Sequence, residues 1–302
     1  VSISSYTSNK TIDLGSAGTS DLVLTSATLD KIQAEALRVG DASSGDITAT
    51  DLDLSTVSAL DLTSAGNVTF NGTVDGDFDL TVNSSGTTTF NGQIGGTTRL
   101  GSLTTDAGGT TAFNISTTDA VDIQGDAVFG DDVTIAGGGQ IWAPRGNSTF
   151  NGSLIGDVDI ILKAFKPITF NGAVRFKGLQ LTSGGQININ GGSIATTEFG
   201  LDFYNDVLLG ADTTLTSVDL VRFRGTVDGA HALQVNASDV TEFRDAVGST
   251  SALKSLTTDA AGTTLLNGGT INVSGNTTTF NDAVILGTDT SITDAGAGAF
   301  NS

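Results

Sequence analysis

Three carboxylates at alternate positions are candidates for metal binding. The stretch VDGDFD contains Asp75, Asp77 and Asp79. Alternate residues of a strand share one face, and carboxylate oxygens are ligands that Ca²⁺ prefers, so this face could hold a surface Ca²⁺. The alternative is a solvated acidic face, which we favour because the later stretch VDGAHAL keeps only Asp228. No other cofactor is expected.

A basic segment at residues 142–177 is the second candidate site. It holds five basic residues against Asp157 and Asp159, a local net charge of +3 in a chain of net charge −20. Its single Trp could stack on a sugar. One interpretation is a surface for acidic glycans or an acidic partner; the other, which we favour, is ordinary surface charge with the Trp in the core. The predicted binding residues are Trp142, Arg145, Lys163, Lys166, Arg175 and Lys177.

The basic segment is expected to place its side chains on two neighbouring strands. Lys163 and Phe165 alternate on one strand face, and Arg175 and Lys177 alternate on the next. Phe203 and Tyr204 are further candidates for stacking on a ligand.

Residues suited to catalysis are scarce. His231 is the single histidine and cysteine is absent, so neither a two-histidine nor a thiolate metal site can form. His231 aligns with Phe78 in the duplication described below, which indicates a strand residue. Carboxylates are plentiful but scattered, whereas a polysaccharide lyase or hydrolase on a β-helix needs them clustered with Arg or Lys in one groove. We expect a protein that is not an enzyme, with such an enzyme as the alternative.

Composition limits the partners. The chain has 302 residues and a sequence pI of about 4.1, which argues against nucleic acid because phosphate binding needs a basic surface. The apolar runs are short, so no membrane insertion is expected in this segment. The opening VSISSYTSNK is not a signal peptide. The acidic surface favours a secreted protein, and without cysteine its stability must come from packing and hydrogen bonds.

A repeat near twenty residues organises the chain. The tetrapeptide TFNG occurs at residues 69–72, 89–92, 149–152 and 169–172. Apolar and polar residues alternate in short segments bounded by Gly, Asn, Asp or Ser, which is typical of strands. A fixed period of this length indicates a solenoid. Hairpins with Asn-Gly turns are the alternative, but recurrence of the same residue types in the same register favours parallel stacking.

The sequence therefore predicts an all-β fold, a right-handed parallel β-helix (β-solenoid) with about 20–23 residues per coil. The repeated Phe should point inward and stack along the core. The repeated Asn should sit at a left-handed bend and pair its amide with the Asn one coil away, and the repeated Gly should let the backbone turn. The predicted structural ladder consists of Phe70, Asn71, Phe90, Asn91, Phe150, Asn151, Phe170 and Asn171.

A longer duplication lies within the repeat. GTVDG at residues 72–76 returns at 225–229, an offset of 153, and LTTDAGGTTAFN at 103–114 matches LTTDAAGTTLLN at 256–267 in the same register. The duplicated blocks span about 60–130 and 213–283. We expect residues 1–302 to be one continuous solenoid segment, a fragment of a longer protein.

The repeats resemble those of large bacterial surface exoproteins. Residues 24–54 and the stretch VTFNGTVDGDFDLTVNSSGTTTFNGQIG at 68–95 are similar to segments of filamentous-haemagglutinin-like and autotransporter-like proteins. This resemblance implies a secreted or surface-bound β-helical protein with adhesive or structural work, and it brings no catalytic motif with it.

The sequence thus predicts a structural and adhesive rod segment of a secreted bacterial surface protein. It would project or form an extracellular binding surface or layer, and its partners would be extracellular glycans, other cell-surface molecules or further copies joined end to end. The alternatives are the polysaccharide enzyme and a self-assembling extracellular fibre or surface-layer subunit.

Overall fold

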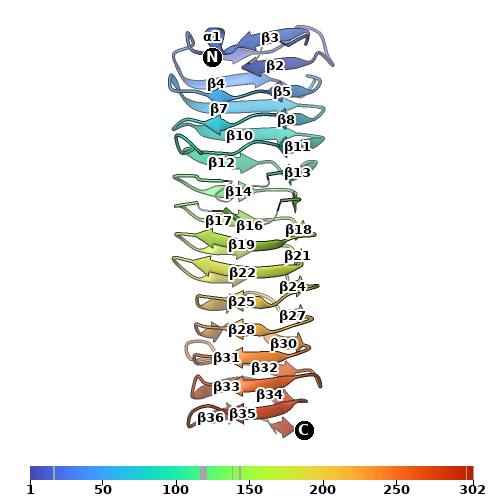
Figure 1. The fold of residues 1–302 in the computed structure, drawn as a ribbon, viewed down its shortest axis with the longest axis vertical. Helices are drawn as coiled ribbons and strands as arrows, with labels where there is room; N and C mark the ends of the chain where they lie inside the picture. The colour runs from blue at the N-terminus through green and yellow to red at the C-terminus, as the bar shows by residue number, and fades with distance from the viewer. Residues whose placement is uncertain (16–17, 116–120, 138, 143, 297, 302) are drawn as a thin grey trace. The chain divides into compact units, whose positions relative to one another are not determined.

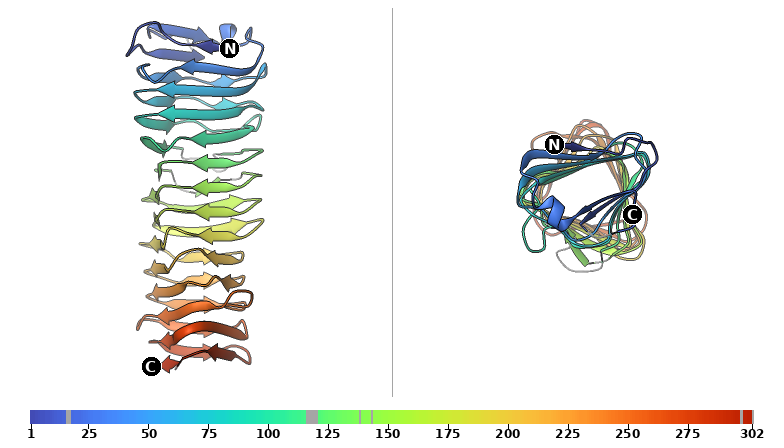
Figure 2. Two further views of the ribbon diagram at one scale, coloured as in Figure 1. Left: turned by 180° about the vertical axis from the view of Figure 1, so that it is seen from behind. Right: turned by 90° about the horizontal axis from the view of Figure 1, so that it is seen from above.

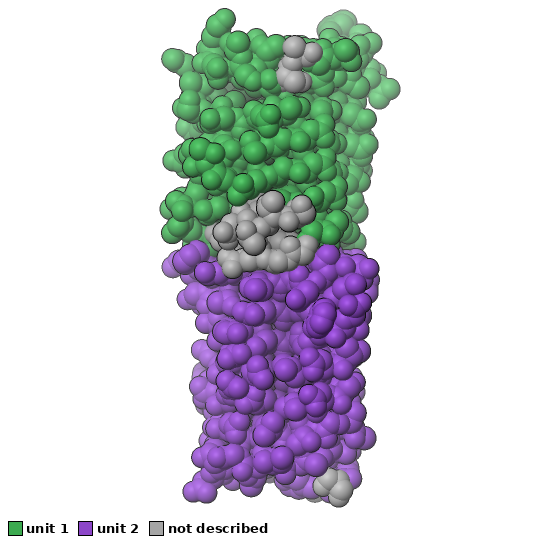
Figure 3. Space-filling model, in the orientation of Figure 1, with its two compact units in different colours: residues 1–154 green, residues 155–302 purple. Residues whose placement is uncertain are grey.

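The computed structural model confirms an all-β solenoid built from parallel sheets. It describes residues 1–15, 18–115, 121–137, 139–142, 144–296 and 298–301. The chain divides into two compact units, Val1–Leu154 and Ile155–Ser302 (Figure 3). Among the described residues, one helix is found, α1 (Ser26–Leu29), and no helix is long and apolar enough to cross a membrane.

Unit 1 has three parallel sheets, each built from one strand per coil (Figure 1). The first sheet contains, in spatial order, β1 (Ser2–Ile3), β4 (Ala34–Gly40), β7 (Val57–Ser64), β10 (Asp79–Ser84), β12 (Ser102–Thr105), β14 (Ala127–Phe129) and β17 (Ser148–Phe150). The second contains β3 (Leu22–Thr25), β2 (Ile12–Gly15), β5 (Ile47–Ala49), β8 (Val68–Phe70), β11 (Thr87–Phe90), β13 (Thr110–Phe113) and β15 (Asp132–Ile135). The third contains β6 (Leu52–Asp53) and β9 (Val74–Asp75), extended by single bridges through Ile94 and Val121. The chain then forms β16 (Gly139–Trp142) and β18 (Leu154–Gly156).

Unit 2 also has three parallel sheets. The first contains β20 (Ile168–Phe170), β23 (Ile187–Ile189), β26 (Val207–Leu209) and β29 (Val227–Asp228). The second contains β21 (Val174–Phe176), β24 (Ser193–Thr196), β27 (Thr213–Ser217), β30 (Ala232–Ala237), β32 (Leu253–Thr258), β34 (Thr270–Phe280), β36 (Ser291–Asp294) and, also paired to β34, β37 (Ala299–Phe300). The third contains β19 (Asp159–Ala164), β22 (Gly178–Ser183), β25 (Leu201–Phe203), β28 (Val221–Phe223), β31 (Val240–Phe243), β33 (Thr263–Leu266) and β35 (Ala283–Leu286).

Strand register sets the length of each coil. In the first sheet of unit 1, Leu80 pairs with Leu60 and with Leu103, offsets of 20 and 23 residues. In unit 2, Ile168 pairs with Ile187, an offset of 19. The expected coil length is therefore confirmed for most coils, whereas the N-terminal coil departs from it, since Ile12 pairs with Ile47 at an offset of 35. Within each unit the coils wind around a core (Figure 2), and buried apolar side chains fill that core.

The phenylalanine core of unit 1 forms two columns. Phe90 stacks on Phe70 and on Phe113, with ring centroids 4.6 Å and 5.1 Å apart. Phe129 meets Phe113 edge to face at 5.7 Å and stacks on Phe150 at 5.2 Å. The change occurs because β13 belongs to the second sheet and β14 to the first. All four predicted ladder phenylalanines are buried. However, Phe70 lies in the second sheet and Phe150 in the first.

The asparagine ladder forms, but by another backbone geometry than expected. Asn91 donates its side-chain amide to Asn71 at 3.1 Å, and Asn190 donates to Asn171 at 2.8 Å. The predicted left-handed bend is wrong: among described non-glycine residues only Asn9 and Asp51 have positive φ. The following glycines are required by close stacking, since a Cβ on Gly92 would lie 2.1 Å from the carbonyl oxygen of Gly72.

The duplicated blocks have the same local structure. At the offset of 153 residues, β10 corresponds to β30, β11 to β31 and β13 to β33. The corner after β9 matches the corner after β29, with φ of +122° at Gly76 and +126° at Gly229. Such values strain residues with a Cβ, so both copies need glycine there.

Phe90 lies between two stacked rings and has no exposed surface. We predict that Phe90→Ala lowers the free energy of unfolding by about 3–5 kcal/mol, because it removes the ring and leaves a cavity. Urea denaturation followed by circular dichroism measures this. The control is Phe165→Ala, at a side chain 46% exposed, which should cost less than about 1 kcal/mol. Equal losses would contradict the packed column.

Candidate functional site

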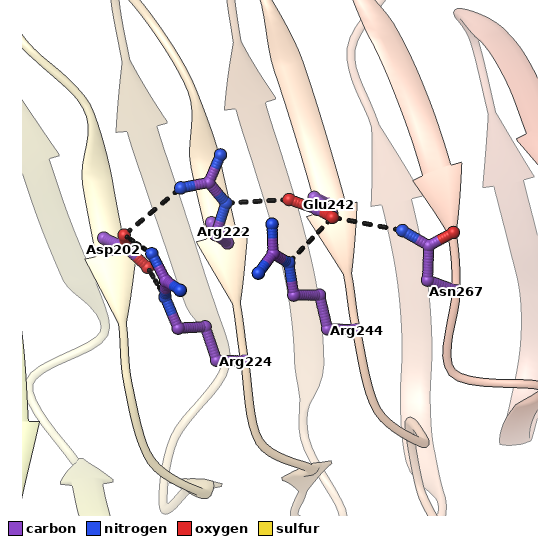
Figure 4. A network of polar contacts seen from close by, with 6 residues as sticks. All are labelled: Asp202, Arg222, Arg224, Glu242, Arg244 and Asn267. Atoms are coloured by element: carbon purple, nitrogen blue, oxygen red, sulfur yellow. Dashed lines mark hydrogen bonds and ion pairs between the residues drawn. The ribbon is translucent and has the colours of Figure 1, made fainter. Parts of the chain in front are cut away.

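A connected polar network lies on the third sheet of unit 2 (Figure 4). The network lies on strands β25, β28 and β31. Each strand has one charged residue between two buried residues, in the sequences LDF, VRF and TEF. Neighbouring side chains of a strand point to opposite faces, so these polar residues face outward. Register then aligns Asp202, Arg222 and Glu242 in one column. We call the set Asp202, Arg222, Arg224, Glu242 and Arg244 the arginine–carboxylate ladder.

Hydrogen bonds join the ladder across three coils. Arg224 donates from Nε and Nη2 to the two oxygens of Asp202, at 2.9 Å and 2.8 Å, a bidentate pair. Arg222 donates from Nε to Glu242 at 2.7 Å and from Nη1 to Asp202 at 3.4 Å. Arg244 donates from Nε to Glu242 at 2.8 Å. Asn267 adds a donor to Glu242 at 3.1 Å.

Glu242 of the ladder is held in its ionised form. Burial acts to raise the pKa of Glu242, but hydrogen bonds from Arg244 and Arg222 outweigh it and leave the pKa below its ordinary value. The hydrogen bond to Asp202 raises the pKa of Arg224. A general acid for glycoside cleavage needs the opposite shift, a raised carboxyl pKa. The ladder is therefore suited to holding arginines in place rather than to donating protons.

An aromatic ring continues the ladder. The guanidinium carbon of Arg224 lies 4.0 Å from the ring centroid of Tyr204, which is a cation–π contact. Tyr204 is 38% exposed, whereas Phe203, the other predicted stacking residue, is buried in the core. Sequence reasoning missed the ladder, although one signal was present: acidic and basic residues alternate at 202, 222 and 242, one coil apart.

The predicted basic segment does not form one surface within unit 2. Lys163 lies on β19, half-buried, with Nζ 5.8 Å from the Phe165 ring centroid, and Lys166 is exposed at the following corner. Arg175 is exposed on β21, in a different sheet. Lys177 pairs with Glu198 at 3.0 Å, and this hydrogen bond raises the lysine pKa. The two strands were expected to be neighbours, but β19 lies in the third sheet and β21 in the second, with β20 between them in sequence.

The two other predicted residues of this segment belong to unit 1. Arg145 is half-buried, and its backbone N–H donates to the carbonyl of Ile123 at 2.8 Å. Trp142 ends β16, and its side chain lies outside the described part of the structure.

The three proposed calcium ligands do not share a strand face. Strand β9 ends at Asp75, the chain turns at Gly76, and β10 begins at Asp79. Asp75 is buried and accepts the backbone N–H groups of Thr97 and Thr98, at 2.7 Å and 3.2 Å, while Asp77 and Asp79 are exposed. In the second duplicated block, Asp228 accepts hydrogen bonds from the backbone N–H groups of Thr250 and Ser251. No group of three potential metal-ligating residues occurs among the described residues.

Many other aspartates connect successive coils. Asp46 accepts the backbone N–H of Asn67 at 2.8 Å, Asp126 that of Asn147 at 2.7 Å, and Asp206 that of Thr226 at 2.9 Å. Each carboxylate thus satisfies an amide at the corner of the next coil, which explains how an acidic chain tolerates close stacking.

Buried carboxylates and the histidine also have structural partners. Asp131 accepts the hydroxyls of Thr105 and Thr111 at about 2.9–3.0 Å, and burial raises its pKa. His231 Nδ1 lies 3.6 Å from Asp212 on a side chain 38% exposed. The expected strand position is wrong: His231 lies in the bend just before β30, as its counterpart Phe78 lies just before β10.

Comparison with known proteins adds no name to this arrangement. No family model matches the chain, and neither a curated protein nor a solved structure matches it.

Asp75 should stabilise the corner of the following coil. We predict that Asp75→Ala lowers the free energy of unfolding by about 1–3 kcal/mol, because two backbone N–H groups lose their acceptor. Asp75→Asn keeps one oxygen acceptor and should lose less. Chemical denaturation compares both with Asp77→Ala, the exposed neighbour, which should be close to wild type. A large loss in the Asp77 variant would contradict this assignment.

Glu242 should stabilise the fold in a pH-dependent way. Its folded pKa lies below the unfolded value, so its contribution is present above the unfolded pKa and is lost as the pH falls through the folded pKa. We predict that Glu242→Gln is less stable than wild type by about 2 kcal/mol at pH 7, and that the gap closes at an acidic pH below the folded pKa of Glu242.

Denaturant unfolding at the two pH values measures the gap. Glu198→Gln is the control, because that carboxylate is 51% exposed in a surface ion pair and should contribute little at either pH. A gap for Glu242→Gln that stays constant with pH would show that lost packing, rather than lost charge, explains the effect.

Proposed function

We propose that this chain is a structural and adhesive segment of a large secreted bacterial surface protein. The observation that carries the proposal is that many polar side chains form hydrogen bonds between neighbouring coils. Asp75, Asp206 and their counterparts accept amides of neighbouring coils, and Asn71 and Asn91 form a ladder. These groups support a stiff stack of coils, as a stalk or spacer needs, and leave the sheet faces to bind ligands.

The resemblance to filamentous-haemagglutinin-like and autotransporter-like repeats supports the same proposal. Such a segment would present a binding surface outside the cell, and its partners would be extracellular glycans or cell-surface molecules. The net charge of −20 would oppose side-by-side clumping of stalks. Surface Ca²⁺ could bridge neighbours through exposed carboxylates such as Asp77 and Asp79.

A β-helical polysaccharide lyase or hydrolase is the second candidate. The observation that favours it is the ladder, which clusters Asp202 and Glu242 with three arginines across neighbouring coils. The lowered pKa of Glu242 weakens this candidate for acid catalysis. The adhesive function requires no such acid and fits the ladder better.

Binding to surfaces tests the adhesive part of the proposal. We predict that the purified chain binds acidic polysaccharides or intact cells in a salt-sensitive manner, because the contacts would be charge-assisted. A variant with Lys163, Lys166, Arg175 and Lys177 changed to Glu runs beside it. Loss of binding in that variant would place the site on the basic segment.

Two outcomes would contradict the proposal. If the chain binds no polysaccharide and no cell, even at low salt, it is a spacer and not an adhesive segment. New reducing ends or unsaturated sugars in the same incubations would favour the enzyme.

A further inference from the structure

We infer that Tyr204, Arg222, Arg224 and Arg244 form a binding strip for an acidic polysaccharide. The inference rests on the adhesive part of the proposed function and names both the surface and the ligand class. It is independent of the basic segment, since none of the four residues lies within residues 142–177.

Charge distinguishes the strip from the rest of the chain. The ladder holds three arginines and two carboxylates, a local net charge of +1. The remaining sequence has 10 basic and 31 acidic residues, a net charge of −21. An anionic polymer would be repelled by most of this surface and attracted here. Two exposed acids, Asp206 and Asp245, flank the strip, and their carboxylates accept the backbone N–H groups of Thr226 and Ala246. At physiological salt the Debye length is about 8 Å, so repulsion from more distant acids is largely screened.

The ladder places its acids beneath its arginines. The side chains of Asp202 and Glu242 are 16% and 11% exposed, whereas those of Arg222, Arg224 and Arg244 are 25%, 28% and 42% exposed. The carboxylates therefore fix the guanidinium groups from below. Fixed side chains lose less conformational entropy when a ligand binds.

Hydrogen-bond donors remain on the outer side. Among the described residues, Arg244 donates to the protein from Nε alone, and Arg222 donates from Nε and Nη1. The two terminal nitrogens of Arg244 and Nη2 of Arg222 are left for a ligand. The planar guanidinium fork matches a carboxylate or sulfate group through two parallel hydrogen bonds.

The strip has the length of a polymer site. Arg224 donates its backbone N–H to Phe203 and Arg244 donates its own to Phe223, both at 2.9 Å, so Tyr204, Arg224 and Arg244 follow one another in successive coils. At about 4.8 Å per coil, the three side chains span on the order of 10 Å. Tyr204 supplies a partly exposed aromatic ring, on which the apolar face of a sugar can pack.

The position within the sheet favours a glycan over a peptide. Extended peptides commonly bind by adding a strand to a free sheet edge. Strands β25, β28 and β31 lie inside their sheet, with β22 paired to one side and β33 to the other. The ligand must therefore bind through side chains alone, as a sugar chain with charged and apolar faces can.

Dextran sulfate is the probe, with uncharged dextran and poly-L-glutamate as comparison polymers. The wild-type chain should bind dextran sulfate, bind poly-L-glutamate more weakly and not bind dextran. The strip variant is Arg224→Gln with Arg244→Gln. It should bind dextran sulfate at least about tenfold more weakly, because two charge-assisted contacts are lost.

The matched control is Arg38→Gln with Arg99→Gln. Those arginines form surface ion pairs with Asp61 and Asp122 in unit 1, and the control loses the same charge. Its affinity should change less than about threefold. Circular dichroism and thermal unfolding verify that each variant folds. Should the strip variant not fold, Arg244→Gln alone serves, since this residue is the most exposed of the three.

Tyr204 provides an independent readout. Tyr204→Ala should weaken binding to dextran sulfate several-fold, and Tyr204→Phe should retain it because the ring is kept. Loss in both variants would assign the effect to the hydroxyl and overturn the stacking role.

The outcomes separate this inference from the proposed function. Equal binding of dextran sulfate by wild type and strip variant would overturn the strip and leave adhesion standing. Equal binding of dextran sulfate and poly-L-glutamate would overturn the polysaccharide assignment. Binding to cells without binding to dextran sulfate would also overturn the strip. No binding to any polymer or cell would overturn adhesion itself.

Discussion

Parallel pairing between successive coils is the interaction on which the rest of the structure depends. Each residue lies directly above its equivalent one coil earlier, as Leu80 does with Leu60. Inside the stack this pairing is favourable for identical residues, because Phe70 and Phe90 meet as stacked rings 4.6 Å apart. Most differences in coil length fall at corners, where no strand partner is displaced, although β34 carries extra residues opposite Leu253 and Ser255 of β32. The twenty-residue repeat is thus a consequence of register.

The same register makes identical charges on the outside unfavourable. Two like charges about 5 Å apart repel, so a charged column on a sheet face is more favourable where the sign alternates. Asp202, Arg222 and Glu242 alternate in this way. Asparagine escapes the restriction because its amide both donates and accepts, as Asn91 does between Asn71 and Asn114. Most aspartates lie at corners instead, where Asp46 and Asp126 accept backbone amides.

These rules explain how much could be predicted from the sequence. The period, the buried phenylalanines and the asparagine pairing follow from residue identity repeated at one spacing. The division among three sheets does not, because the marker TFNG gives the period but not the sheet: Phe90 ends β11 in the second sheet and Phe150 ends β17 in the first. The two strands expected for the basic segment are not neighbours, for a related reason. Lys163 lies on β19 in the third sheet and Arg175 on β21 in the second, with β20 between them in sequence.

The titration behaviour of the carboxylates bears on what the surface can do. Catalytic acids need a carboxyl group whose pKa is raised and which a substrate can reach. Burial raises the pKa of Asp131 and that of Asp259, but Asp131 is enclosed by Thr105 and Thr111, and Asp259 accepts the backbone N–H of Ala237. On the outer face, Glu242 has a lowered pKa because two arginines hold its charge. Asp131 is therefore enclosed, and half-buried Asp259 has one oxygen engaged by a backbone amide. A carboxylate held ionised in this way keeps its arginine partners in place on the outer face, an arrangement suited to contact with an anion.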